Sequence, residues 1–146
     1  MKNSVPSSTQ SSSQELLIKG DLPKLNEMIG NARTHWSASA KEKEDYTEWV
    51  MMQCFRMKPI TGPVTLRFLW FYSSKHDFDN IRVGVKHILD GIKGAGKIPD
   101  DNQQWVKGFR GDYFIKVPKN KEAVLIFIED YVPETLTDSH GICYTV

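Results

Sequence analysis

Residues Val64 to Ser74 read VTLRFLWFYSS, and this stretch decides the fold. It is rich in β-branched and aromatic residues, which favour a β-strand. The side chains of a strand alternate between two faces. One face here carries Leu66, Phe68, Trp70 and Tyr72, and the other carries Leu69 and Phe71. Because both faces are apolar, we expect a central strand that is covered on both sides.

Segments of both helical and strand character surround this strand. Apolar patterns and turn signals predict further strands at Leu16–Lys19 and Trp105–Arg110, and a β-hairpin in which Pro118-Lys119-Asn120 joins Tyr113–Val117 to Ala123–Tyr131. They predict helices at about Asn26–Arg33, Ala38–Met57 and Asn80–Lys93. We therefore expect an α+β domain over residues 15–146, with helices packed on a small mixed or mainly antiparallel sheet. Residues 1–14 are rich in Ser, Thr and Gln and predict a disordered tail.

Composition limits the class of protein. The chain has 146 residues, 40% of them hydrophobic, which suits one domain with its own core. Its two cysteines, Cys54 and Cys143, are far apart and lack zinc-ligand spacing, which favours a reducing compartment. No apolar run has transmembrane length, and the start lacks the pattern of a signal peptide. We expect a cytoplasmic protein, in a bacterium or a phage-infected host cell, with no membrane partner.

Charge is unevenly distributed along the chain, although the net charge is only +1. Residues 81–121 contain nine Lys and Arg against four Asp and Glu. Residues 122–146 contain five acids and neither Lys nor Arg. This segregation would allow a basic face for phosphates, although charged runs also simply solvate surface loops.

Aspartates flank the helix predicted at Asn80–Lys93. Asp77 and Asp79 precede it, and Asp100 and Asp101 follow it. Taken singly, Asp79 suits a helix N-cap, and the later pair suits a turn. Taken together, carboxylates that converge would repel each other unless a cation joined them, and an incomplete shell of oxygen ligands suits Mg²⁺.

Lys86 lies on the polar stripe of the same helix. It could face this site and stabilise charge that develops on a phosphate. It could equally form an ion pair with Asp90, four residues later. The sequence leaves both interpretations open.

A glycine-rich segment after this helix resembles a phosphate-binding loop only superficially. Residues 91–97, GIKGAGK, match the first part of the P-loop pattern, but Ile98 stands where Ser or Thr is needed. The segment also closes a helix instead of opening one. We interpret Gly94 and Gly96, followed by Pro99, as a helix stop.

One set of polar and apolar residues lies in order between positions 77 and 103: Asp77-Phe78-Asp79-Asn80, Lys86, Leu89-Asp90-Gly91-Ile92, Gly96 and Asp100-Asp101-Asn102-Gln103. In this order, these residues resemble the signature of the RusA family of Holliday junction resolvases. The dense part of the match covers about 30 residues, from Asp77 to Gln103. Leu22-Pro23, Leu25-Asn26 and the closing hairpin look like versions found in phage-borne relatives. One departure is that the lysine falls six residues after Asn80 instead of three, close to one helical turn further on.

The resemblance implies a homodimeric, Mg²⁺-dependent endonuclease that nicks four-way DNA junctions symmetrically in recombination and repair. It implies that Asp77, Asp79 and Asp101 bind the metal, with Mn²⁺ as an alternative ion, and that Lys86 is the essential lysine. Asp100 and Asp90 are further candidates. We also expect basic residues to hold backbone phosphates, notably Arg82, Lys107 and Arg110.

Two alternatives remain beside this reading. The first is a protein that binds branched DNA without cleaving it. The second is a nuclease that acts on flaps or replication forks.

Overall fold

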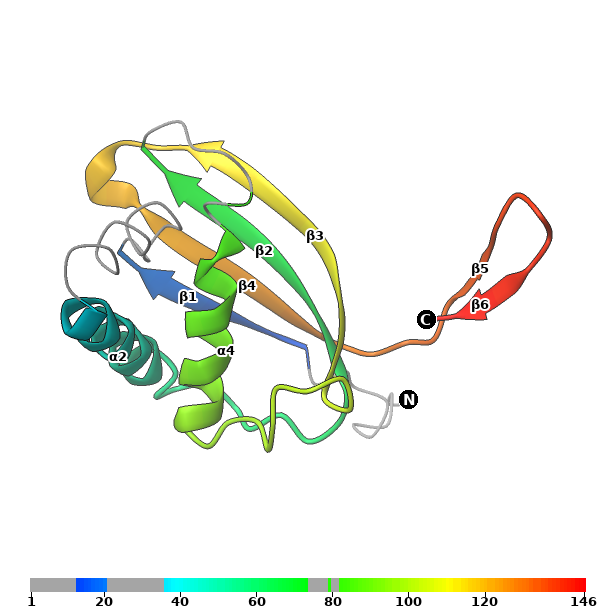
Figure 1. The fold of residues 1–146 in the computed structure, drawn as a ribbon, viewed down its shortest axis with the longest axis horizontal. Helices are drawn as coiled ribbons and strands as arrows, with labels where there is room; N and C mark the ends of the chain where they lie inside the picture. Colours follow the sequence, from blue (N-terminus) through cyan, green and yellow to red (C-terminus); the bar gives the residue numbers. More distant parts are fainter. Residues whose placement is uncertain (1–12, 21–35, 74–78, 80–81) are drawn as a thin grey trace, which may run out of the picture.

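The computed structural model describes residues 13–20, 36–73, 79 and 82–146. Its centre is a mixed four-stranded sheet in the order β1-β4-β2-β3. The strands are β1 (Gln14–Lys19), β2 (Val64–Tyr72), β3 (Val106–Lys116) and β4 (Ala123–Asp130). β4 is antiparallel to β1 and β2, whereas β3 is parallel to β2 (Figure 1). The predicted α+β fold class is confirmed.

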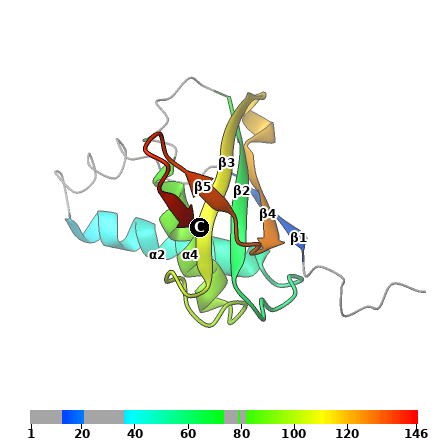
Figure 2. The ribbon, with the colours of Figure 1, turned by 90° about the vertical axis from the view of Figure 1, so that its right-hand side faces the viewer.

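The strand predicted from VTLRFLWFYSS forms β2, and it lies inside the sheet between β4 and β3. Its alternate residues from Val64 to Tyr72 are buried, and Phe68 and Trp70 are completely so. Helices α2 (Trp36–Gln53) and α4 (Gly84–Gly94) cover this face of the sheet (Figure 2). The hydrophobic core therefore lies between the sheet and two helices, as the apolar stripe of β2 predicts.

The opposite face of the sheet departs from the prediction. Within the described residues both helices lie on one side, so Leu69 and Phe71 are only half-buried and β2 is not covered on both sides. Residues paired directly across strands share a face. The cross-strand pairs on this side are Leu69–Tyr113, Phe71–Ile115, Leu69–Leu125 and Arg67–Phe127. Their apolar members form a surface that is here called the open sheet face: Leu69, Phe71, Tyr113, Ile115, Leu125 and Phe127.

The predicted closing hairpin is wrong. Residues 106–116 form one strand, not two, and β3 does not pair with β4, because β2 lies between them. The break predicted at Pro118-Lys119-Asn120 is confirmed, since the short 3-10 helix η2 (Lys119–Lys121) separates β3 from β4. Val117 donates a backbone hydrogen bond to Tyr72 at 3.0 Å, so the chain crosses the end of β2 before it enters β4. A strand as apolar as β2 is the better central partner for both neighbours.

The glycines of residues 91–97 have a packing role and a terminating role. Gly91 lies inside α4 and is buried, and a Cβ atom there would overlap the side chain of Val50 on α2. The helix ends at Gly94, and Gly96 has a φ of 73°, which favours glycine. The helix-stop interpretation is confirmed, and these residues form no phosphate loop.

Two boundaries differ from the prediction near the start of the chain. Gln14, assigned to the tail, is the first residue of β1, and its side chain exchanges hydrogen bonds with the backbone of Lys58. The predicted helix at Asn26–Arg33 lies outside the described residues. The next helix, predicted at Ala38–Met57, is α2 over Trp36–Gln53.

A small separate hairpin follows the main sheet. β5 (Thr135–Thr137) pairs antiparallel with β6 (Cys143–Thr145), and the sequence did not predict it. Figure 1 shows this hairpin standing away from the main sheet at the end of an extended link. Within the ranges that the structure describes, no helix combines the length and apolar character that a bilayer span requires.

Candidate functional site

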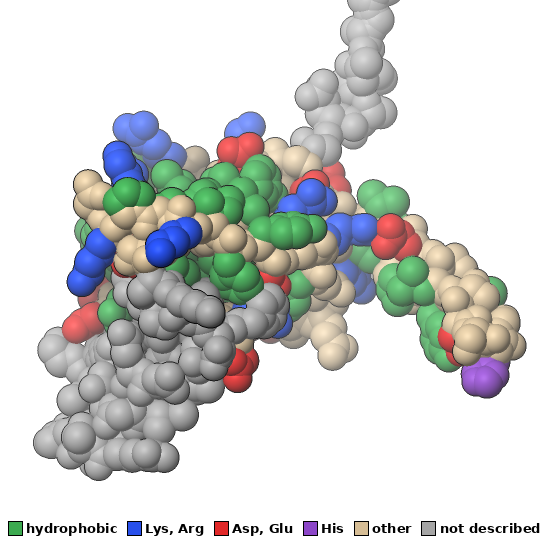
Figure 3. Space-filling model, turned by 90° about the horizontal axis from the view of Figure 1, so that it is seen from above, with side chains coloured by type: hydrophobic (Ala, Val, Ile, Leu, Met, Phe, Trp, Pro, Cys, Tyr) green, Lys and Arg blue, Asp and Glu red, His purple; other side chains and the backbone are tan. Residues whose placement is uncertain are grey.

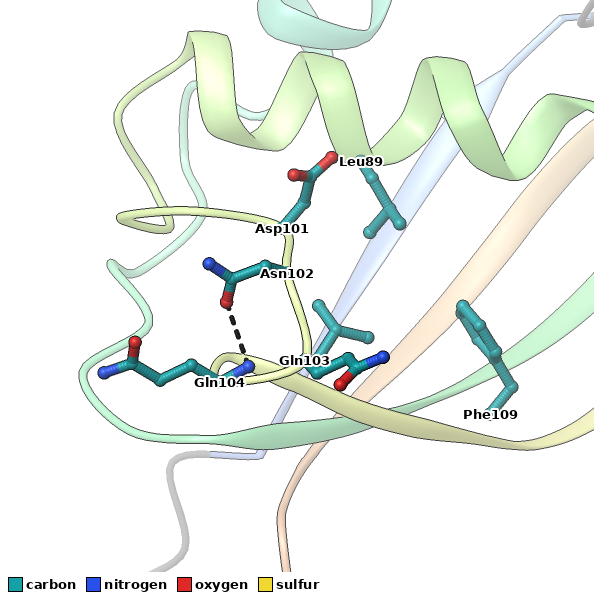
Figure 4. A pocket seen from close by; sticks show the side chains of 7 residues that line it. Leu89, Asp101, Asn102, Gln103, Gln104 and Phe109 are labelled. Carbon is teal, nitrogen blue, oxygen red and sulfur yellow. Dashed lines mark hydrogen bonds between the residues drawn. The ribbon is translucent and has the colours of Figure 1, made fainter.

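A pocket of about 700 Å³ lies where the loop after α4 passes under that helix and enters β3. Its lining residues are Leu89, Asp101, Asn102, Gln103, Gln104, Val106 and Phe109. In Figure 4 the carboxylate of Asp101 points toward α4, above the amides of the loop. The pocket thus combines one carboxylate and several amide groups with apolar walls from the helix and the strand.

The two aspartates of this loop have different roles. Asp100 Oδ1 accepts a hydrogen bond from the backbone N–H of Asp101 at 2.8 Å, and its Oδ2 accepts one from Asn102 Nδ2 at 3.0 Å. Lys93 Nζ lies 3.0 Å from Asp100 Oδ1, and this contact is the main reason that the pKa of Asp100 is lowered. Asp100 therefore stabilises the loop by contacts with Lys93 of α4 and with the next two residues of the loop. Asp101 is the carboxylate that lines the pocket.

Lys86 forms the ion pair that the sequence left as one of two interpretations. Its Nζ lies 2.9 Å from Asp90 Oδ1, on the exposed side of α4. The hydrogen bond from Lys86 to Asp90 is the main cause that raises the pKa of Lys86, and the charge of Asp101 raises it further. The structure thus confirms the ion-pair interpretation, and a role of Lys86 at a phosphate stays a prediction.

The other two predicted metal ligands lie before α4. Asp77 lies outside the described residues. Asp79 is described and exposed, five residues before the first residue of α4. Across the described ranges, which lack Asp77, no three His, Cys, Asp or Glu side chains are grouped as a metal site. The pocket lining itself offers the Asp101 carboxylate and the Gln103 amide oxygen, which are hard oxygen donors of the kind that Mg²⁺ prefers.

Of the predicted phosphate-binding residues, the structure brings only Arg82 to the pocket. Its guanidinium lies 5.2 Å from the ring centre of Phe109, a lining residue. Its Nε also lies 3.1 Å from Asp112 Oδ2. Arg82 is therefore oriented beside the pocket by a carboxylate and an aromatic ring.

The other two cations lie elsewhere. Arg110 forms an ion pair with Glu134 at 3.0 Å and lines a different pocket with Arg67 and Glu129. Lys107 Nζ lies 5.4 Å from the ring centre of Tyr131. The three predicted residues therefore do not form a single basic patch around Asp101.

Two residues of this region were missed by the sequence analysis. Asp112 is almost buried and accepts a hydrogen bond from Trp70 Nε1 at 2.8 Å in addition to its contact with Arg82. Phe109 forms the apolar wall of the pocket. Both lie on the helix side of the sheet, because Phe109 pairs with Leu66 and Asp112 pairs with Phe68. They are three residues apart, so simple alternation would place them on opposite faces, and only the irregularity of β3 between them brings both to one face.

No protein-family model matches this sequence, and a comparison with curated proteins finds no significant match.

Proposed function

We propose that this protein is a Mg²⁺-dependent endonuclease of the RusA type, which resolves four-way DNA junctions. The observation that carries the proposal is Asp101, whose carboxylate points into a pocket beneath the helix that bears Lys86. A carboxylate can hold a metal ion, and a lysine ammonium can stabilise the charge that develops on a phosphate.

Asp79 and Asp101, together with Asp77, would hold the metal ion. A bound Mg²⁺ would supply a Lewis acid for the phosphodiester and lower the pKa of a water molecule. Lys86 keeps its charge because Asp90 raises its pKa, and that charge stabilises the negative phosphate as the bond breaks. Arg82, stacked on Phe109, would contact the DNA backbone beside the cleavage point.

The substrate sets the expected assembly. A four-way junction has approximate two-fold symmetry, and two equivalent nicks require two equivalent active sites, so the protein would act as a homodimer. Because recombining DNA lies in the cytoplasm of a bacterium or phage-infected cell, we propose that compartment.

A cleavage assay on a panel of substrates tests this function. Purified protein is incubated with labelled four-way junction, flap, fork and linear duplex, with Mg²⁺, with Mn²⁺ or with EDTA. The proposal predicts paired, symmetric nicks in the four-way junction that require the metal ion. Cleavage confined to flaps or forks would identify the alternative nuclease, and absence of cleavage on every substrate would contradict the nuclease assignment.

A protein that binds branched DNA without cutting it is the second candidate. The observation that favours it is the pairing of the cations around the pocket: Lys86 contacts Asp90, and Arg82 contacts Asp112. Such pairs orient the cations but reduce the charge that is available to a reacting phosphate. Tight, specific binding of the four-way junction without nicks in Mg²⁺ or Mn²⁺ would select this candidate.

A further inference from the structure

A second pocket, of about 690 Å³, lies at the other end of the sheet from the candidate site. The candidate site adjoins the start of β3, where Val106 pairs with Val64, whereas this pocket lies where β1 and β2 end and β4 begins. Figure 1 shows η2, which contributes to its rim, at the opposite end of the strands from the loop after α4. Among the described residues, the two pockets share no lining residue. The second pocket is therefore a separate candidate for ligand binding.

The floor of this pocket is apolar and lies on the side of the sheet away from the helices. Ala123 pairs with Lys19 of β1 and with Phe71 of β2, so these side chains form one row across three strands. The single methyl group of Ala123 between two longer side chains leaves a hollow, and Leu17 and Val117 add apolar walls. An aromatic ring beside a hollow of this kind suits a flat ligand group that can stack.

The rim of the pocket is basic. Lys19, Lys119 and Lys121 line it, and within the part of the chain that the structure describes none of these lysines forms an ion pair. The acid among the lining residues is Glu122, whose Oε2 accepts hydrogen bonds from the backbone N–H of Ser73 at 2.9 Å and from its hydroxyl at 2.6 Å. Three lysines against one glutamate leave two positive charges, which match the charge of a phosphate monoester. Figure 3 shows hydrophobic side chains beside Lys and Arg side chains on the body of the molecule.

The backbone segments that carry these lysines are held together. Gly20 donates a backbone hydrogen bond to the carbonyl oxygen of Glu122 at 2.9 Å, which joins the end of β1 to the start of β4. The carbonyl oxygen of Lys19 accepts a hydrogen bond from Trp49 Nε1 of α2 at 2.8 Å. The other two lysines lie on η2, one turn of helix directly before Glu122. Only the lysine side chains therefore need to be ordered when a ligand binds, which lowers the entropic cost.

We propose that this pocket binds a single unpaired nucleotide, with the base on the apolar floor and the phosphate on the lysines. The side-chain amide of Asn120, another lining residue, offers a hydrogen-bond donor and an acceptor for the edge of a base. A hydrocarbon chain would leave this amide without a partner, and a phosphate ion alone would leave the apolar floor in contact with water. A free nucleotide and one nucleotide of a single strand share the chemistry that the pocket recognises. The inference holds whether or not the protein cleaves DNA.

Isothermal titration calorimetry of the full chain tests which ligand binds. The probes are thymidine 5′-monophosphate, thymidine, octyl phosphate, inorganic phosphate and a single-stranded thymidylate hexamer. The nucleotide should bind more tightly than thymidine, octyl phosphate or inorganic phosphate by about tenfold or more, because it alone combines a base with a phosphate. Tighter binding of the hexamer would identify a single strand as the source, and equal binding would identify a free nucleotide. Equal affinity for octyl phosphate or inorganic phosphate, or no binding of either nucleotide probe, would overturn the proposal.

Two variants test whether the nucleotide occupies this pocket. Lys119→Ala/Lys121→Ala removes two charges from the rim, and Ala123→Leu fills the hollow without a change in charge. Each should raise the Kd of the nucleotide by about tenfold or more. The matched control Arg56→Ala/Lys58→Ala removes two exposed cations elsewhere and should leave the Kd unchanged. Equal affinity of the rim variant and the control would overturn the proposal.

NMR of the unchanged chain locates the nucleotide without any substitution, so the test does not depend on the folding of a variant. Amide shifts should change at Gly20 and over residues 119–123 when thymidine 5′-monophosphate is added. Changes confined to residues 101–104 would place the nucleotide at the candidate active site and overturn the proposal. None of these measurements involves cleavage, so their failure is distinct from failure of the proposed function.

Discussion

The Nε atom of Arg82 lies 3.1 Å from Oδ2 of Asp112, whose side chain is only 8% exposed. The other oxygen of Asp112 accepts a hydrogen bond from Trp70, a completely buried residue. One carboxylate on β3 therefore connects the start of the α4 region to the core of β2. It also orients Arg82 over Phe109 at the candidate site.

Asp112→Ala should destabilise the protein by about 1–3 kcal/mol, because it removes two contacts and leaves the buried Trp70 N–H without its acceptor. Urea unfolding followed by fluorescence measures the change. Glu129→Ala is the matched control, since the Arg67–Glu129 pair at 3.3 Å is much more exposed and should contribute less than about 1 kcal/mol. Equal effects of the two substitutions would show that the Asp112 contacts are not structural.

Gly91→Ala should also destabilise the fold. The added methyl would overlap Val50, which is completely buried on α2. Overpacking of this kind costs about 1–3 kcal/mol, more than the gain of about 1 kcal/mol that alanine gives a helix. Gly62→Ala is the control, because nothing lies within 4 Å of a Cβ atom there. A higher melting temperature for Gly91→Ala would contradict the close approach of the two helices.

The fold could be predicted from the sequence in part. The apolar alternation of β2 and the glycine stop after α4 predicted both elements well, because each depends on local patterning. The pairing of β3 with β2 was not predictable, since long-range strand order depends on which neighbour best covers an apolar strand. The open sheet face was missed because apolar residues on both faces of β2 favoured a strand covered on both sides, and the hairpin was missed because its two strands are only three residues long.

The candidate site was predictable only in part. The sequence assigned Lys86 and Asp101 to one site, and the charge of Asp101 does contribute to the raised pKa of Lys86. Asp100 was indistinguishable from Asp101 in the sequence, and only the hydrogen bonds of the loop separate their roles. Arg110 seemed equivalent to Arg82, but alternation and the bulges of β3 direct it to Glu134.

The two cysteines should differ sharply in reactivity. Burial raises the pKa of the Cys54 thiol to about 11, so it stays protonated at pH 8 and is also inaccessible. Cys143 is exposed on the hairpin. Mass spectrometry after treatment with a maleimide at pH 8 should find one label, at Cys143, until denaturant is added. Labelling of Cys54 in the folded protein would contradict its position in the core.

Asp90→Asn should lower the pKa of Lys86. The Asp90 carboxylate is the main cause of the raised pKa, so its removal lets the lysine lose its proton at a lower pH. NMR titration of the lysine side chain measures the midpoint directly. If Lys86 acts on the phosphate, the alkaline limb of the cleavage profile should move to lower pH in the same variant. Glu44→Gln, an exposed carboxylate on α2, should change neither, and an unchanged midpoint in Asp90→Asn would contradict the ion pair.

Cleavage of a four-way junction by Asp101→Asn, with Glu44→Gln as the control, tests the central claim most directly. Asparagine keeps the size of the side chain but removes the charge that would hold the metal ion. The account predicts that nicking in Mg²⁺ falls at least 100-fold in Asp101→Asn, while gel-shift binding of the junction and the melting temperature stay close to those of the control. Nicking by Asp101→Asn at the rate of the unchanged protein would contradict the proposed active site.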